Sequence, residues 1–296
     1  MQNNNKIITK KIVKKKRTLK LWVWVVISIF FLSIIFISIG KIILWKLDSN
    51  SSKDIMNNIN ENISINEIND NENTEIINEP EDLTSDYWYY ITFPLIDVDF
   101  TELKKKNSDT VGWINVNNTN INYPFVQTSD NDYYLTHSFD KTYNDAGWVF
   151  LDYRNNSDFS DKNTIIYAHS RLDKTMFGSL SKVLKEDWYT NKDNHIIRIS
   201  TETENTLWQI FSVYVIETES YYITTNFSSN SEYQSFLDTI KSRSKYNFDA
   251  ELSTNDNILT LSTCYSDTEK TVVHAKLIKR EKKWFNFKSF FYNHII

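Results

Sequence analysis

The sequence has a single cysteine among its 296 residues, Cys264, and this scarcity excludes any disulfide bond within the chain. Glycine and proline are also scarce, with four and three residues, and no internal repeat is present. Residues 1–20 lack acidic side chains but contain eight Lys or Arg, and residues 21–40 lack charge altogether. These shortages direct attention to the N-terminal region and to the lone thiol.

The uncharged run at residues 21–40 is long enough to cross a bilayer as a helix. Twenty residues at about 1.5 Å rise match a hydrocarbon core of roughly 30 Å. A cleaved signal peptide has a shorter apolar core, and no small-x-small cleavage site follows this run. The preceding basic residues predict a cytoplasmic N-terminus. We therefore predict a basic cytoplasmic tail at 1–20, a transmembrane helix at 21–44, and a single-pass protein of the cell membrane with an extracellular body.

The charge distribution is asymmetric along the chain. The whole sequence carries −5 and residues 1–20 carry +8, so the remainder carries −13. An acidic body argues against nucleic-acid binding, because the basic residues lie before the predicted span. The predicted partner of the basic end is therefore the membrane.

Residues 45–85 are predicted to form a polar, acidic linker. From Lys53 to Ser85 there are nine acidic residues and one lysine, and the isolated isoleucines make no wide apolar face. Such a segment buries too little surface to offset the entropy of ordering it, so we expect a spacer between membrane and domain. The folded domain is predicted at 86–283. An aromatic tail follows at 284–296 and is too short to span a bilayer.

The domain contains many short strand-like runs separated by polar clusters, a pattern that indicates a β-barrel or sandwich. The runs lie at 111–116, 121–127, 147–153, 163–169, 195–200, 206–218, 257–264 and 271–279. Helices are predicted from Asp99, at about 175–186, and from Ser231. The last of these places Tyr233, Phe236 and neighbouring apolar residues at helical spacing.

Cys264 ends a strand whose residues alternate in character. Leu259 and Leu261 suit a core, so Ser262 and Cys264 point to the other side. A thiol at a strand end and away from the core is rigidly held and accessible, as a nucleophile requires. The competing interpretation is a buried, inert cysteine.

A cysteine nucleophile needs a group that moves protons, usually an imidazole. The chain has five histidines, and two suit this role. His169 follows the apolar run 164–168 in phase with Tyr167, and His274 lies in mid-strand off the expected core face. The residues alone favour neither of them, and for each the alternative is a surface or hydrogen-bonded structural histidine.

Several segments resemble the sortase family. The sequence TLSTC at 260–264 resembles the TLxTC signature of sortases, and NTIIYAHSRLDKTMFGSL at 163–180 resembles the family's histidine segment. VGWI at 111–114, YPFVQ at 123–127, NDYYL at 131–135 and FLDYRN at 150–155 are similar to class B sortases in order and spacing. The likeness covers about residues 86–280.

This resemblance implies a mostly β fold: a closed eight-stranded β-barrel with an N-terminal helical segment and a helix before the cysteine strand. It implies a cysteine transpeptidase in which Cys264 is the nucleophile and His169 the acid–base partner, with no cofactor and no metal. Its substrates would be secreted proteins bearing an Asn-Pro-x-Thr-like sorting signal. The acyl group would pass through a thioester to an amine of peptidoglycan or its lipid-linked precursor.

One position departs from the family. Sortases have an arginine near the start of the strand after the cysteine, and Lys270 aligns with it, keeping the charge but losing the planar pair of donors. An ordinary solvated lysine is the alternative for Lys270. The positions that match the family's substrate contacts are Asn131, Leu135, Tyr167, Tyr222, Ile223 and Ser262. Barrel packing is an equally good explanation for Leu135, Tyr222 and Ile223.

Two other functions use the same residues. One is a cysteine hydrolase with water as the acceptor. The other is a weakly active or inactive homologue that binds sorting signals, which only Lys270 favours. The presence of both Cys264 and His169 argues against it, because binding requires neither.

Overall fold

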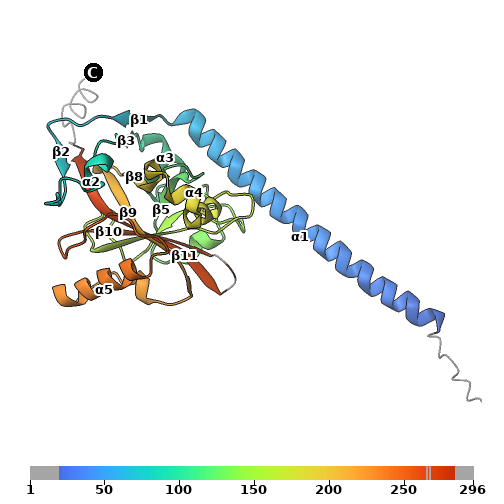
Figure 1. The fold of residues 1–296 in the computed structure, drawn as a ribbon. Coiled ribbons are helices and arrows are strands. Elements are labelled where there is room, and N and C mark those ends of the chain that lie inside the picture. Colours follow the sequence, from blue (N-terminus) through green and yellow to red (C-terminus); the bar gives the residue numbers. More distant parts are fainter. Residues whose placement is uncertain (1–19, 265, 267, 284–296) are drawn as a thin grey trace, which may run out of the picture. The chain divides into compact units, whose positions relative to one another are not determined.

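The computed structural model describes residues 20–264, 266 and 268–283 (Figure 1). The predicted tails, 1–20 and 284–296, therefore lie outside the described residues, apart from Lys20. Two compact units are present, residues 1–46 and 47–296. The described part of the first unit is helical and belongs to α1 (Leu21–Asn62).

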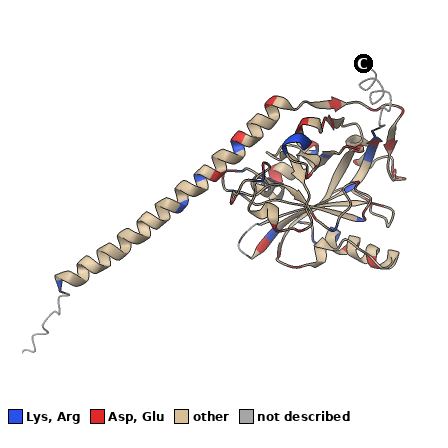
Figure 2. Ribbon diagram, turned by 180° about the vertical axis from the view of Figure 1, so that it is seen from behind, with Lys and Arg blue, Asp and Glu red and all other residues tan. Residues whose placement is uncertain are grey.

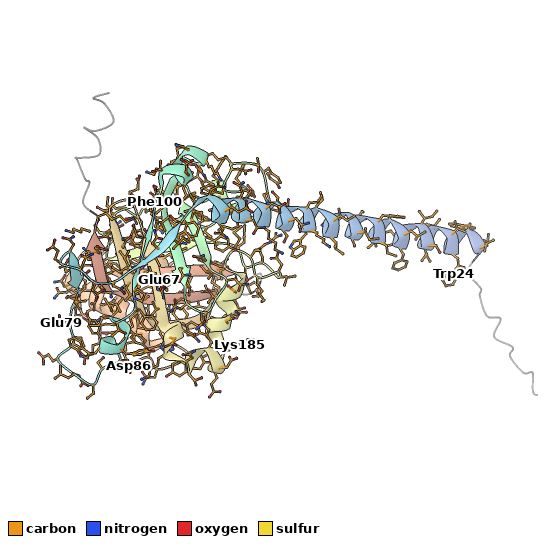
Figure 3. The ribbon with its side chains drawn as sticks, turned by 90° about the horizontal axis from the view of Figure 1, so that it is seen from above. Trp24, Glu67, Glu79, Asp86, Phe100 and Lys185 are labelled. Atoms are coloured by element: carbon orange, nitrogen blue, oxygen red, sulfur yellow. The ribbon has the colours of Figure 1, made fainter. Side chains whose placement is uncertain are left out.

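The first half of α1 is long and apolar enough to cross a membrane, by length and composition. Charged residues are sparse along this part of the helix (Figure 2). Its apolar side chains extend outward, as labelled Trp24 does at 55 % exposure (Figure 3). The helix is compatible with the membrane anchor predicted at 21–44.

The predicted linker contains packed structure, so the expectation of an unstructured spacer is wrong for residues 47–76. Helix α1 continues to Asn62, and its Met56 and Ile59 are buried in the second unit. β1 (Ile65–Ile68) pairs with β3 (Leu95–Val98), and β2 (Thr74–Ile76) pairs with the last strand of the barrel. The isolated isoleucines are too sparse to make a periodic face, but each packs individually against the core of the second unit.

Eight strands form a closed barrel, and each coincides with one of the predicted runs. They are β4 (Thr110–Val116), β5 (Asn122–Val126), β6 (Phe150–Leu151), β7 (Asn163–Tyr167), β8 (Ile196–Ser200), β9 (Glu204–Glu217), β10 (Ile258–Cys264) and β11 (Glu269–Lys282). Their order is β10-β7-β6-β5-β4-β8-β9-β11, and pairing of β10 with β11 closes the ring. The predicted fold class is confirmed. β7 and β10 are parallel neighbours, which matters for the site.

Short helices lie between the strands. They are α2 (Tyr87–Tyr90), α3 (Thr101–Lys106), η1 (Tyr133–Leu135), η2 (Gly178–Leu184), α4 (Glu186–Tyr189), η3 (Lys192–His195), η4 (Tyr221–Ile223) and α5 (Asn230–Ser242). The predicted helix at 175–186 is a 3₁₀ segment followed by a short α-helix. Helix α5 is capped by Ser229 rather than Ser231, because the Ser229 hydroxyl accepts a hydrogen bond from the Glu232 amide.

The core fills the barrel and extends outside it under α5. Large side chains such as Trp113, Trp148 and Trp208 are fully buried. The apolar face of α5, which includes Phe236, packs on Phe211 and Ile258 of β9 and β10. The outer face of these strands is therefore covered at one end by α5.

Candidate active site

A groove of about 390 Å³ lies at the carboxyl ends of β7 and β10. All eight predicted site residues whose side chains the structure describes line it. The lining comprises Asn131, Leu135, Phe150, Tyr167, Ala168, His169, Thr218, Glu219, Tyr222, Ile223, Ser262, Thr263 and Lys270. The lining is mainly apolar, with a few polar groups converging on it, as in small-peptide and ligand sites.

His169 stands two residues beyond the end of β7 and is half-buried. Its Nε2 lies 2.8 Å from the carbonyl oxygen of Leu135, at the end of η1. Since a carbonyl can only accept, Nε2 carries the proton, and in the neutral ring Nδ1 is the basic nitrogen. The carbonyl thus fixes both the tautomer and the ring orientation.

Gly147 supports this arrangement and was missed by sequence reasoning. Its φ is +59°, and a Cβ there would lie 2.5 Å from the Tyr134 carbonyl oxygen, 2.8 Å from that of Leu135 and 3.0 Å from His169 Cδ2. Only glycine permits both the backbone conformation and this close approach. The available signal was a glycine in a chain with only four of them.

The backbone of the cysteine strand runs beside the histidine strand. Ser262 of β10 is opposite Tyr167 of β7 in a parallel pair, and Cys264 and His169 each lie two residues further along. The backbone of Cys264 is therefore brought to the same end of the barrel as His169. The side chain of Cys264 lies outside the described residues.

Lys270 is placed by the register of β11. It is the direct antiparallel partner of Cys264 in β10 and of Ile216 in β9. Opposed residues in such a pair have Cβ atoms roughly 5 Å apart. A cation therefore lines the groove beside the cysteine backbone, where the resemblance expects an arginine; its role remains a prediction.

His274 points away from the barrel interior, as the strand phase predicts, but a second apolar cluster under α5 covers it. Its ring is fully buried on the outside of the barrel, next to Phe236 of α5. Nε2 pairs with the Tyr214 hydroxyl at 2.8 Å and Nδ1 with the Thr260 hydroxyl at 2.9 Å. Burial, with help from the charge of Arg243, lowers its pKa to about 3. This neutral histidine has both nitrogens occupied, which leaves His169 as the candidate.

A buried carboxylate organises one wall of the groove. Asp152 accepts hydrogen bonds from the Tyr167 hydroxyl at 2.9 Å and from Arg154 Nη2 at 2.7 Å. Burial raises the pKa of Asp152, but these hydrogen bonds outweigh burial and the net shift is downward. Arg154 Nη2 also donates to the Ile223 carbonyl at 3.1 Å, which ties η4 to this network. Sequence reasoning did not single out Asp152 or Arg154.

The remaining predicted contacts both pack and line the groove. Tyr222 is buried against Tyr214 and Val272, and its hydroxyl lies 3.1 Å from Ser262 Oγ. Asn131 is anchored because its Oδ1 accepts from the Tyr153 amide at 3.0 Å. Packing and substrate contact are therefore not exclusive at these positions.

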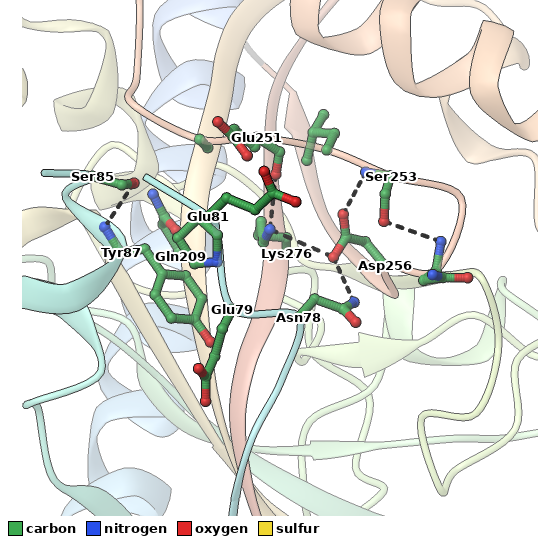
Figure 4. A pocket seen from close by; sticks show the side chains of 14 residues that line it. Asn78, Glu79, Glu81, Ser85, Tyr87, Gln209, Glu251, Ser253, Asp256 and Lys276 are labelled. Atoms are coloured by element: carbon green, nitrogen blue, oxygen red, sulfur yellow. Dashed lines mark hydrogen bonds and ion pairs between the residues drawn. The ribbon is translucent and has the colours of Figure 1, made fainter. Parts of the chain in front are cut away.

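A second pocket, of about 340 Å³, lies between residues 78–87 and 250–256 (Figure 4). Its buried Lys276 donates to the Glu251 carbonyl at 2.8 Å and lies 3.5 Å from Asp256, which also accepts from Asn78 (Figure 4). These polar groups satisfy one another. None of the predicted site residues lines this pocket.

A histidine after β7 lies beside a cysteine that ends the adjacent parallel strand of a closed barrel, the arrangement of an enzyme that acts through a cysteine nucleophile. The Sortase domain family model matches residues 114–278. Sortase B of Listeria monocytogenes is 39% identical over 181 residues, covering 61% of this chain and 72% of the relative. Sortase B of Staphylococcus aureus is 40% identical over 184 residues, covering 61% and 75%.

Solved structures give the same result. The sortase B of Clostridium perfringens matches with a TM-score of 0.58 and 34% identity, covering 61% of this chain and 100% of that one. A Staphylococcus aureus sortase B–substrate complex matches with a TM-score of 0.57 and 39% identity, covering 61% and 84%. The chain belongs to the sortase family. Within it, the chain is a cysteine transpeptidase of the sortase B type.

Proposed function

We propose that this sortase is anchored in the membrane by residues 21–44, with its N-terminus in the cytoplasm and its catalytic unit outside. It cleaves an Asn-Pro-x-Thr-like sorting signal on secreted proteins and transfers them to an amine of peptidoglycan or its lipid-linked precursor. The observation that carries the proposal is the single groove lined by the eight described candidate residues, at the end of the cysteine strand.

In this proposal the thiolate of Cys264 attacks the threonine carbonyl carbon of the signal. The peptide C–N bond breaks as His169 gives a proton to the departing amine, and a thioester remains. The acceptor amine then attacks the thioester carbonyl and expels the thiolate, while His169 takes back a proton. Because Nε2 is held by the Leu135 carbonyl, Nδ1 is the nitrogen that exchanges the proton.

Lys270 supplies positive charge beside the cysteine in this scheme. A cation there stabilises the negative oxygen of the tetrahedral intermediate or holds the signal backbone. Glu219 also lines the groove, but Arg243 Nη1 binds its carboxylate at 2.5 Å. That pairing reduces competition between Glu219 and the developing negative charge for Lys270.

The test is peptide cleavage by the full chain in detergent micelles. Fluorogenic peptides with Asn-Pro-x-Thr and Leu-Pro-x-Thr signals are supplied with and without a glycine-peptide amine, and Cys264→Ala serves as the blank. We expect cleavage of the Asn-Pro-x-Thr peptide and formation of the amine-ligated product. Release without ligation supports the hydrolase alternative, and binding without release supports the inactive homologue.

A further inference from the structure

The second half of α1 contacts the loops that hold His169. Ser49 and Ser52 on this helix are each only 2 % exposed. Buried hydroxyls require partners. The Ser52 hydroxyl donates to the Asp48 carbonyl of its own helix at 3.0 Å, and both serine hydroxyls also bond to distant parts of the chain. These contacts lie within the second unit, residues 47–296.

The first contact is with Asp173, in the loop that follows His169. The Ser49 hydroxyl donates to Asp173 Oδ2, and Lys53 Nζ lies 3.2 Å from the same oxygen. Burial raises the pKa of Asp173, but hydrogen bonds from Ser49, Thr175 and Lys53 outweigh burial and lower the pKa to about 2. The Asp173 side chain is only 13 % exposed, so this charge-assisted contact is largely shielded from water.

The loop transmits this contact to His169 because it is a tight hairpin. The Phe177 amide donates to the His169 carbonyl at 3.0 Å, and Ser170 forms a β-bridge with Met176. Asp173 Oδ1 in turn accepts from the Thr175 hydroxyl at 2.7 Å, which closes the tip. Two non-glycine residues of the hairpin, Lys174 (φ 66°) and Met176 (φ 50°), adopt the left-handed conformation. Such residues persist where surrounding contacts enforce them.

The second contact is with the segment that leads to Gly147. Asn144 Nδ2 donates to the Asp48 carbonyl at 3.1 Å and to the Ser52 hydroxyl at 3.3 Å. The Asn144 carbonyl accepts from the Gly147 amide at 2.9 Å, and Gly147 is the glycine that abuts the His169 ring. The helix therefore contacts both the hairpin that follows His169 and the segment that leads to Gly147.

We propose that residues 48–53 form a helix clamp and that Asp173 is a positioning residue of the transpeptidase. The clamp fixes the hairpin that carries His169, and the same helix continues into the predicted span at 21–44. Catalytic geometry is thus set by the helix that anchors the enzyme. This inference rests on the proposed role of His169.

The test uses the full chain in detergent micelles, with Asp173→Asn, Ser49→Ala and the double variant. Ser51→Ala is the matched control, because Ser51 is exposed on the same helix. We expect kcat for peptide cleavage to fall roughly tenfold in Asp173→Asn with KM little changed, since small misplacements of a catalytic group are costly. The double variant should lose no more than the larger single effect, because both changes remove one contact. Asp173→Glu should restore part of kcat.

Wild-type kcat in a folded Asp173→Asn enzyme would overturn the clamp. A loss of kcat in Ser51→Ala as large as that in Asp173→Asn would also overturn it. A lower unfolding temperature with unchanged kcat would assign Asp173 a purely structural role and also overturn it. The proposed function fails separately, if His169→Ala retains wild-type turnover, whatever the clamp variants do.

Discussion

Replacing Gly147 by alanine tests how His169 is held. The backbone there has φ +59°, a conformation that costs a non-glycine residue about 1–2 kcal/mol. The added Cβ would lie 2.5 Å from the Tyr134 carbonyl oxygen and 3.0 Å from His169 Cδ2, so backbone and ring must move. Overpacking of this kind costs about 1–3 kcal/mol. Together these effects predict a loss of roughly 2–5 kcal/mol in the free energy of unfolding.

The rate of peptide cleavage by Gly147→Ala should fall by more than the loss of folded enzyme explains. The Leu135 carbonyl, 2.8 Å from the new Cβ, is also the group that binds His169 Nε2. A displacement of about 1 Å at a catalytic group costs on the order of 100-fold in rate. We expect single-turnover cleavage of the signal peptide at 20 °C to be slower by this order in molecules that are still folded.

Gly40→Ala is the matched control, because a Cβ at Gly40 meets no atom within 4 Å. Circular dichroism before the assay reports the folded fraction of each variant. A folded Gly147→Ala enzyme with wild-type cleavage would refute the assignment of this glycine and of the Leu135 carbonyl to the placement of the ring.

Four further outcomes are expected. Cys264→Ala should abolish release of the signal peptide, and release that persists would eliminate this nucleophile. Lys270→Arg should maintain or raise kcat/KM, because the planar guanidinium restores two donors; a tenfold drop would count against the charge role. His169→Ala should abolish turnover while His274→Gln spares it in the folded enzyme, and the reverse pattern would show that the histidines are misassigned. The pKa of His274 falls to about 3 on folding, so between about pH 6.5 and 3 only the unfolded chain binds a proton at this residue. The contribution of neutral His274 to the free energy of unfolding is therefore present at pH 7 and is lost as the pH falls. Between pH 6.5 and 5 the wild type should lose up to about 2 kcal/mol more than His274→Gln in urea unfolding, and parallel losses would contradict this.

The barrel strands could be predicted from the sequence because their signals are local. Short strand-like runs bounded by polar clusters identified each of the eight strands, and alternation of apolar and polar residues supported the cysteine strand. β1 and β2 have four and three residues, and their pairing with β3 and β11 joins segments that are distant in the chain. The same holds for the burial of Met56 and Ile59 on α1.

The candidate site was predicted chiefly from the resemblance, because strand phase alone could not choose between two histidines. The alternation of side-chain directions along the strands correctly placed His169 and His274 outside the barrel interior. It could not show that α5 covers His274, since that contact joins segments distant in the chain. The sequence also could not identify the Leu135 carbonyl as the partner of His169, because every residue has a backbone carbonyl whatever its side chain.

The parallel pairing of β7 with β10 has a consequence for when the thiol becomes reactive. His169 and Cys264 are 95 positions apart in the chain and become neighbours only when β10 inserts between β7 and β11. An unfolded chain therefore carries an ordinary thiol, without the imidazole and the cation beside it. The catalytic pair is assembled only in the folded barrel, so the thiol of an unfolded chain has no neighbouring base to activate it.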